Sequence, residues 1–414
     1  MVKSAHYNYK KEISMDTSSK AYKLLSLIAI SGECSKDVYP FLYLTDSYNE
    51  KLMTRLKSDG LIKIHYKDKL RGIRLTRRGK DLLLSLSPER FSNNLTDNSE
   101  TNRPRSDLPR RLRLQQASIA YAMLQCAGIP VYPEEKPALF SGNPQDSAKF
   151  ALPLFYTARE WKELGAETIK INNSRSLGIL LCEDALYVLY FTGDHPIKWE
   201  YRTELRLKAF LNYHLKQDIF AGLCQKNTDY PIKAIFLGSP MDSARILMES
   251  NGGFQKSYFY LDGSFDFMHF LPVSMEGITM LKLLSSPTLQ STLNTLLLSD
   301  LEPVNPDLGL IHDAIKGTTP VLLSYNFDML RLSRFKTALS FHEITGHLIC
   351  FDFQKDTLQS YFGDLATIET IDLVKNKLSD SKEDLPDSLL IDPTKEEFTD
   401  APVRKEESTN GASE

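Results

Sequence analysis

The stretches LMTRLKSDGLIKI (residues 52–64) and IRLTRRGKDLLL (residues 73–84) decide the fold of the first part of the chain. Leu52 and Leu56 lie four residues apart, so they share one face of a helix, and Gly60 ends that helix. The residues that follow, LIKIHY, alternate apolar and polar side chains as a half-buried strand does. The first stretch therefore predicts a helix that ends at Gly60 and leads directly into a strand.

The second stretch predicts the return of that strand and a further helix. IRLT alternates in the same way, and the basic segment KDKLRG (67–72) is the expected turn between the two strands. TRRGKDLLLSL then begins a closing helix. The helix before the hairpin is predicted over 47–58, with Ser47 and Glu50 forming a capping box at its start.

Two more helices are predicted upstream. In SSKAYKLLSLIAISGE, Leu24 and Ile28 fall on one helical face, Ser18 or Ser19 is the cap, and Gly32 ends the helix. The segment SKDVYPFLYL that follows predicts a short second helix, although it contains Pro40.

The positive charge of the chain is concentrated in its first third. The 414 residues carry a net charge of −3. Residues 1–115 hold 23 Lys and Arg against 13 Asp and Glu, whereas the remainder holds 27 against 40. Residues 61–80 hold eight basic residues and a single acid, Asp68. Such asymmetry indicates a polyanion-binding head on an acidic body.

The order of these elements resembles the winged helix-turn-helix family. The resemblance lies in Leu56-x-x-x-Gly60-Leu61-Ile62, followed about a dozen residues later by Leu75-Thr76-x-x-Gly79. It implies a DNA-binding domain whose helix over 47–58 enters the major groove and whose hairpin lies along the backbone or in the minor groove. Winged helices also serve as protein-binding modules, so a scaffold role is an alternative.

Candidate DNA contacts follow from this interpretation. Those on the helix point away from Leu52 and Leu56 and reach base edges or phosphates, and those on and after the hairpin hold phosphates. They are Ser47, Lys51, Thr54 and Lys57 on the helix, and Lys67, Lys69, Arg71, Arg74, Arg77 and Arg78 on and after the hairpin. Arg103, Arg105, Arg110, Arg111 and Arg113 are expected to extend the same basic surface.

Composition divides the chain into five parts. Residues 1–17 are a polar arm, 18–90 form the winged helix (the head), and 91–107 are a Ser/Asn/Thr-rich linker. Residues 108–378 form a mixed α/β body. Residues 379–414, with 11 acids and four bases, are an acidic tail that is predicted to be disordered.

The body is predicted to be built from strand–helix units. A helix from PRRLRLQQASIAYAMLQCAG has Leu112, Ile119, Met123 and Leu124 on its inner face, and LGILLCEDALYVLYFTG is a buried hairpin. YPIKAIFLG, TPVLLSY and GHLICFDF each precede a helical segment, which predicts α/β layers. YFYLDGSFDFMHF predicts another hairpin, with Asp262 and Gly263 at its turn.

No enzymatic motif is complete in this body. The helix–hairpin–helix–strand order is that of a restriction-endonuclease-like core, but ALYVLYF lacks the (D/E)-x-K that such chemistry needs. The nearby candidates have the wrong spacing; they are Glu183, Asp184, Glu204 and Lys208. Glu204 and Lys208 are expected to form a surface ion pair. HEITGH (342–347) spaces its histidines five apart, which does not suit a zinc helix. We therefore expect no catalytic residues, no metal and no cofactor, with a divergent metal-dependent nuclease as the alternative.

The chain as a whole resembles the replication-relaxation proteins of Gram-positive plasmids and conjugative elements. The resemblance rests on the head, the Arg-rich segment after it, the helix ending LQCAGIPV, and SRSLGILL with its strand pair. It implies an accessory role in plasmid replication, DNA relaxation or conjugative transfer, or in transcriptional control. The implied partners are double-stranded DNA and a relaxase or replication protein, and a homodimer is expected as well.

The remaining composition is typical of a soluble cytoplasmic protein. Hydrophobic residues make up 42% of the chain and charged residues 25%, which excludes a collagen-like or wholly disordered chain. No apolar run approaches the roughly 18 residues of a membrane span, and the N-terminus has no apolar core of a secretion signal. The five cysteines are scattered without a CxxC pair, so we expect neither disulfides nor a zinc cluster.

Overall fold

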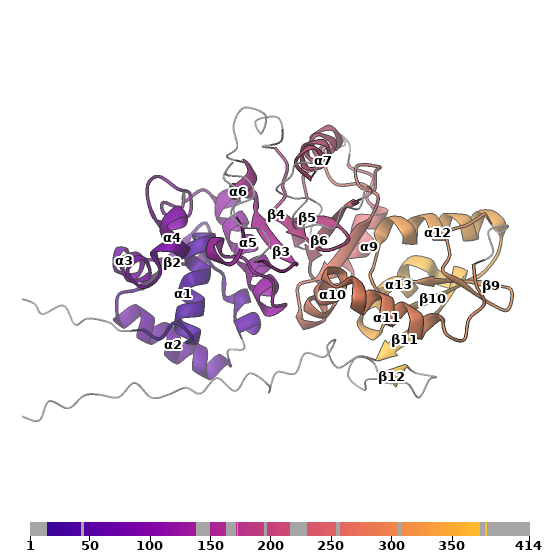
Figure 1. Ribbon diagram of the computed structural model, residues 1–414, viewed down its shortest axis with the longest axis horizontal. Helices are drawn as coiled ribbons and strands as arrows, with labels where there is room; N and C mark the ends of the chain where they lie inside the picture. The colour runs from indigo at the N-terminus through magenta and orange to yellow at the C-terminus, as the bar shows by residue number, and fades with distance from the viewer. Residues whose placement is uncertain are drawn as a thin grey trace, which may run out of the picture.

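The computed structural model is a mixed α/β protein with twelve α-helices and three β-sheets among the residues that it describes. Figure 1 shows the head at one end of the long axis, a five-stranded sheet in the middle and a second five-stranded sheet at the other end. The described residues are 15–42, 45–137, 150–162, 171, 173–193, 197–215, 230–253, 257–304, 309–372 and 377–378. Most of the predicted N-terminal arm and the whole predicted acidic tail lie outside them.

The head begins with a helix that follows the sequence prediction. α1 spans Lys20–Ser31; the side chain of Ser19 caps it by accepting a hydrogen bond from the backbone N–H of Tyr22. Gly32, with φ of 81°, ends it in a conformation that favours glycine. The prediction of a short second helix is wrong, because two separate 3₁₀ turns, Lys36–Val38 and Pro40–Leu42, occupy that segment. Pro40 has no N–H to donate, so a continuous helix cannot run through it.

α2 spans Asp46–Ser58 and buries Leu52 and Leu56, as the helical spacing predicts. Its start differs from the prediction, because the cap is Thr45, whose side chain accepts from the backbone N–H of Tyr48. The capping box of Ser47 and Glu50 is therefore wrong. Both residues lie one or more positions inside the helix, and both are exposed.

A two-stranded hairpin follows α2. β1 (Ile62–Lys67) pairs antiparallel with β2 (Leu70–Leu75), so the turn contains only Asp68 and Lys69, not the six residues predicted. Both turn residues have positive φ, 53° and 59°, which is the backbone of a tight type I′ turn. One face of the hairpin carries Ile62, Ile64, Ile73 and Leu75, and the other carries Lys63, His65, Gly72 and Arg74.

Two helices close the head, and the second enters the predicted linker. α3 spans Arg77–Leu86 and α4 spans Pro88–Leu95. Phe91 and Leu95 are buried, and the Phe91 ring meets Tyr22 edge-on at 6.2 Å between ring centroids. Residues 91–95 were assigned to a linker because polar residues surround them, but the two apolar side chains anchor them to α1.

α5, which spans Leu108–Cys126, packs between the head and the central sheet. It contacts α1 and β2 on the head side and β5 and α10 on the other side (Figure 1). Ile119, Met123 and Leu124 are buried as predicted, whereas Leu112 is 41% exposed, so its place on the inner face is wrong.

The central sheet has the strand order β3-β4-β5-β6-β7. β3, β4 and β5 are antiparallel neighbours, whereas β5, β6 and β7 run parallel, with α7 and α9 as their connections. These elements confirm the buried hairpin and the strand–helix units. They are β3 (Leu154–Thr157), α6 (Ala158–Lys162), β4 (Gly178–Leu181), β5 (Leu186–Gly193), α7 (Tyr201–Leu215), β6 (Ile232–Gly238), α9 (Ser243–Glu249) and β7 (Met268–Pro272), with a 3₁₀ turn at Pro133–Glu135 before them.

One predicted hairpin is absent from this region. Tyr258 and Tyr260 form single bridges with Lys198 and Asn251, and β7 pairs in parallel with β6. The Asp262–Gly263 turn therefore precedes a sheet strand and does not join two strands. The carboxylate of Asp262 accepts a hydrogen bond from the indole N–H of Trp199 at 2.7 Å.

The second five-stranded sheet has the order β12-β11-β10-β9-β8, with β9, β10 and β11 parallel. The predicted strand–helix units are present here too. The elements are α10 (Met275–Ser285), α11 (Pro287–Leu298), β8 (Ala314–Lys316), β9 (Thr319–Leu323), α12 (Met329–His342), β10 (Gly346–Phe351), α13 (Lys355–Phe362), β11 (Ala366–Asp372) and β12 (Lys377–Leu378), with 3₁₀ turns at Asp352–Gln354 and Gly363–Leu365.

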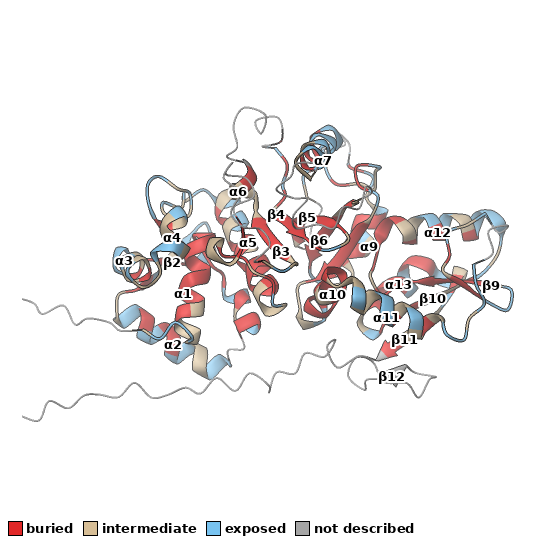
Figure 2. Ribbon diagram, in the orientation of Figure 1, coloured by how far each residue is buried: buried red, intermediate tan, exposed pale blue. Residues whose placement is uncertain are grey.

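Burial is continuous from the head into both sheets. Figure 2 shows the strands of the central sheet buried along their length, while the outer sides of α3 and α7 are exposed. The buried apolar side chains of the head and of the two sheets form one cluster. Among the described helices, none is long and apolar enough to cross a membrane.

Candidate functional site

The predicted contact residues of α2 form one exposed stripe. Ser47, Lys51, Thr54 and Lys57 follow one another at intervals of three or four residues, so they share a face of the helix. All four are exposed, and Leu52 on the opposite side is only 6% exposed. α2 therefore packs by its apolar face and presents two lysines and two hydroxyls to solvent.

The hairpin presents a second group of positive charges. Lys67, Lys69 and Arg71 are exposed at and beside its turn, and Asp68 is the acid between them. Tyr66, beside the turn, is 68% exposed. The type I′ turn keeps the hairpin short, so these side chains project from a small, well-defined tip.

Arg77 and Arg78 are exposed in the first turn of α3. Thr76 caps this helix, accepting a hydrogen bond from the backbone N–H of Gly79 at 3.1 Å, and its hydroxyl donates to the Gly60 carbonyl at 2.5 Å. A Cβ at Gly79 would lie 2.2 Å from the Leu61 carbonyl oxygen. Only glycine lets α3 pack this closely on the backbone of Leu61, so α3 and its two arginines begin next to the segment that joins α2 to β1.

Arg74 does not belong to the exposed basic surface on which the prediction placed it. Its side chain is 8% exposed. Its Nε donates to Glu33 at 2.6 Å, and its two Nη groups donate to the carbonyl oxygens of Pro104 and Arg105. These bonds keep the guanidinium away from solvent.

Arg111 was also predicted to extend the exposed basic surface, and this is wrong, because the residue is fully buried. Its guanidinium donates to both carboxylate oxygens of Glu33 and to the backbone carbonyls of His65, Lys67 and Leu70, at 2.8 to 3.2 Å. Three carbonyls of one hairpin are thus held by one side chain of α5. Arg103, Arg105 and Arg113 are exposed and Arg110 is half-buried.

Glu33 is the centre of this network. It accepts from Arg74, Arg111 and the Gln115 side chain, the last at 2.7 Å. Burial acts to raise the pKa of Glu33, but the hydrogen bonds from Arg111, Gln115 and Arg74 outweigh it and hold the pKa below its usual value. The carboxylate is therefore charged and locks β1 and β2 to α5.

Sequence reasoning missed Glu33 and Gln115. The signal that points to them is Gly72, a glycine inside a strand, which often marks a close approach of another group. A Cβ at this position would lie 2.0 Å from a carboxylate oxygen of Glu33. The glycine leaves the space that the carboxylate fills.

The residues weighed for nuclease chemistry are not brought together. Glu204 is 2% exposed and accepts hydrogen bonds from Ser174 and Tyr190, and Asp184 lies 3.9 Å from Lys233. Asp184 precedes β5, whereas Tyr190 lies six residues further on. A strand rises about 3.3 Å per residue, so the Cα atoms of Asp184 and Tyr190 are about 20 Å apart. Because Glu204 is hydrogen-bonded to Tyr190, Asp184 and Glu204 lie too far apart to share one metal ion.

The predicted surface ion pair of Glu204 and Lys208 is wrong. Lys208 instead donates to Asp266 at 2.9 Å. In HEITGH, His342 ends α12, whereas His347 lies in β10 and contacts Glu369 at 2.9 Å. Within the described ranges, no three His, Cys, Asp or Glu side chains are grouped so that they could hold a metal ion.

Comparison of the chain with family models, with curated proteins and with solved structures finds no match. The head itself carries three features that bear on function: an exposed polar stripe on α2, an exposed basic hairpin tip, and a buried network that fixes the hairpin.

Proposed function

We propose that the head is a winged helix that binds double-stranded DNA. The observation that carries the proposal is the basic tip of Lys67, Lys69 and Arg71 on a hairpin whose backbone is held by Arg111. Such a tip loses little conformational entropy when it binds, because its backbone is already ordered. Phosphate backbones are recognised chiefly by such positive charges.

The two exposed groups take different roles in this proposal. The side chains of α2, above all Lys51 and Thr54, lie on a helix face that fits the major groove and read base edges. The hairpin tip, with Arg77 and Arg78, contacts phosphates and positions the helix without reading sequence. Arg74 is buried and belongs to neither exposed group.

The biological setting in the proposal is a mobile genetic element. The similarity to replication-relaxation proteins supports an accessory role in plasmid replication, DNA relaxation, conjugative transfer or transcriptional control, in the cytoplasm and as a homodimer. Genes for a relaxase or a replication protein beside the coding gene would support this setting. Sedimentation of the free protein and of its DNA complex tests the homodimer.

The test is a fluorescence-anisotropy titration of selected and scrambled duplexes at several salt concentrations. Each phosphate contact lowers log affinity by about 0.9 for each tenfold rise in salt. Replacing Lys67, Lys69 and Arg71 together by alanine should therefore flatten the slope by roughly two to three units and weaken both duplexes alike. A matched control removes three exposed cations of the body, in the variant R206A/R334A/K355A, and should keep the wild-type slope.

The role of α2 is tested in the same assay. Lys51→Ala or Thr54→Ala should cost about 1–3 kcal/mol on the selected duplex and little on the scrambled one. If the triple hairpin variant instead keeps the wild-type salt slope, the hairpin does not contact DNA. In that case the head is a protein-binding module.

A further inference from the structure

A pocket of about 250 Å³ lies beside the hairpin, near Lys63 of β1 and Arg74 of β2. Its walls come from the end of α1, from β1 and β2, from α3 and from the segment that follows α4. The lining residues are Ile28, Gly32, Lys63, Arg74, Leu75, Lys80, Thr101, Asn102, Arg103 and Pro104. All of them lie in the described part of the chain, and they include four cationic side chains and no acidic one.

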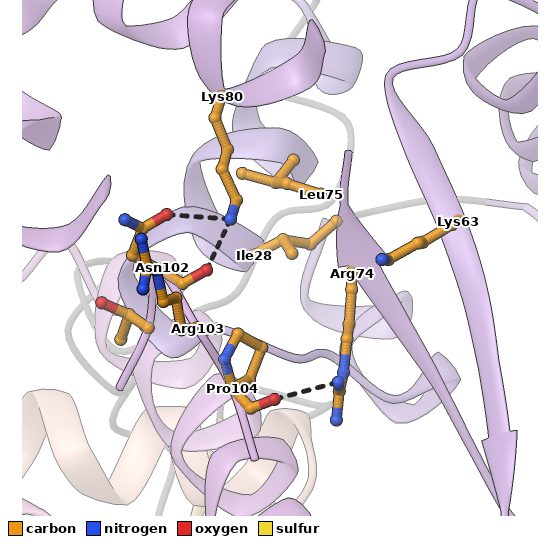
Figure 3. A pocket seen from close by; sticks show the side chains of 10 residues that line it. Ile28, Lys63, Arg74, Leu75, Lys80, Asn102, Arg103 and Pro104 are labelled. Carbon is orange, nitrogen blue, oxygen red and sulfur yellow. Dashed lines mark hydrogen bonds between the residues drawn. The ribbon is translucent and has the colours of Figure 1, made fainter. Parts of the chain in front are cut away.

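The lysines of the pocket point toward the same space. Figure 3 shows Lys80 reaching in from α3 and Lys63 from β1, with Arg74 below them. The ammonium group of Lys80 donates to the backbone and side-chain oxygens of Asn102, at 2.5 and 2.9 Å, and both acceptors are uncharged. Lys63 and Arg103 are exposed at the rim.

The charges in the pocket repel one another. The pKa of Lys80 is lowered, first by burial and then by the positive charges of Lys63 and Arg103. Asp81 opposes this shift, but its side chain is 68% exposed and lies 4.0 Å from Arg77. Lys63, Lys80 and Arg103 therefore face one another with no carboxylate among the residues that line the pocket.

The network below the pocket adds to the excess. Glu33 carries one negative charge, and it is shared between two guanidinium groups, Arg74 and Arg111, both buried. The buried network thus has a surplus of one positive charge. Arg74 is the member that lines the pocket, and a surplus charge at low dielectric favours an anion nearby.

We propose that this pocket binds a phosphate group. Its volume lies below the roughly 300–1,000 Å³ of pockets for drug-sized ligands, so it suits one small anionic group and not a whole organic ligand. Lysine and arginine together provide both the charge and the hydrogen-bond donors that phosphate oxygens accept. The phosphate is presented either by the backbone of bound DNA or by a free phosphate-bearing ligand.

The position of the pocket connects it with the hairpin tip. Lys63 and Lys67 are four residues apart in β1, so they lie on the same face of the strand. Arg77 and Lys80 are three residues apart on α3, so they are neighbours on the helix surface. A row of cations therefore leads from the tip and from the start of α3 into the pocket. The DNA source of the phosphate rests on the function proposed above, whereas the free ligand does not.

The first test is calorimetric titration of the full chain with inorganic phosphate and with pyrophosphate at constant ionic strength. The variant K63A/R103A removes the two exposed cations of the rim, and because both side chains are exposed we expect little change in the stability of the fold. We expect it to bind both anions at least tenfold more weakly than the wild type. The control K36A/R334A removes two exposed cations elsewhere and should bind as the wild type does. Equal binding by K63A/R103A and the wild type would overturn the proposal, as would equal losses in both variants.

The second test distinguishes the two sources of phosphate. If DNA supplies the phosphate, K63A/R103A flattens the salt slope of DNA binding by roughly one unit, and inorganic phosphate competes with the duplex. If a free ligand supplies it, the variant loses phosphate binding but binds DNA as the wild type does. Wild-type phosphate binding that is lost in K63A/R103A supports the pocket even when the triple hairpin variant keeps its DNA affinity. The failure of the proposed DNA function is therefore distinguishable from the failure of the pocket.

Discussion

Replacing Glu33 with Gln should destabilise the head by about 3–5 kcal/mol, the usual cost of breaking a buried ion pair by removing one partner. The carboxylate accepts five hydrogen bonds from Arg74, Arg111 and Gln115. In the variant, two buried guanidinium groups lose their only shared counter-charge, and the amide group of the new Gln directs donors toward donors. A loss of this size lowers the folding equilibrium constant about 10²- to 10⁴-fold.

Hydrogen exchange of the hairpin amides measures this loss locally, because regions of a protein open with their own free energies. In Glu33→Gln, the amides of β1 and β2 should exchange faster by the same factor, while those of the central sheet change little. The control Glu50→Gln removes an exposed carboxylate of α2 and should leave both unchanged.

The variant E33Q/R111M refines the interpretation. Glu33→Gln leaves two buried guanidinium groups without a counter-charge, whereas the double variant leaves only that of Arg74, so the double loss should be smaller than the sum of the two single losses. A loss below about 1 kcal/mol in Glu33→Gln, with wild-type protection of the hairpin, would refute the view that this network holds the hairpin.

Two further predictions concern the same head and the central sheet. Gly72→Ala places a Cβ 2.0 Å from a carboxylate oxygen of Glu33, so it should lower the free energy of unfolding about as much as Glu33→Gln does. The control Gly263→Ala has open space around it and should leave the urea midpoint unchanged. His269 is 2% exposed, and burial lowers its pKa although the charge of Asp328 acts to raise it, so the folded protein favours the neutral imidazole. Protonation therefore favours the unfolded chain. The free energy of unfolding is unaffected by this group above the unfolded pKa of about 6.5 and decreases as the pH falls below it. The melting temperature should therefore drop from pH 7 to 5, and by less in His269→Phe; an equal drop in both proteins would contradict the assignment.

Local patterns predicted the elements of this protein well. The four-residue spacing of Leu52 and Leu56 identified the buried face of α2, and the alternation of Ile62 and Ile64 identified β1. The strand–helix units of the body were also visible, because each repeats a period that its own secondary structure imposes on the side chains. These periodic patterns can be recognised from residues that are close together in the sequence.

Several errors at the candidate site arose where a partner lies far away in sequence. Arg74 and Arg111 were counted as surface charge because both stand in strongly basic segments, yet the carboxylate that binds them, that of Glu33, lies 41 and 78 residues away in sequence. Residues 91–95 looked like linker because two apolar side chains in a polar stretch give no period. The Glu204–Lys208 pair failed for the same reason, since each side chain has a distant partner.

The clamp formed by Arg111 and Gln115 also sets the order in which the chain matures during synthesis. The hairpin ends at Leu75, but the side chains that satisfy its inner carbonyls belong to α5, which ends at Cys126. A ribosome adding about 5–20 residues per second needs roughly 3 to 10 s to make the intervening stretch. For that interval Glu33 and the hairpin carbonyls remain hydrated, and the nascent head completes its packing only together with the first helix of the body.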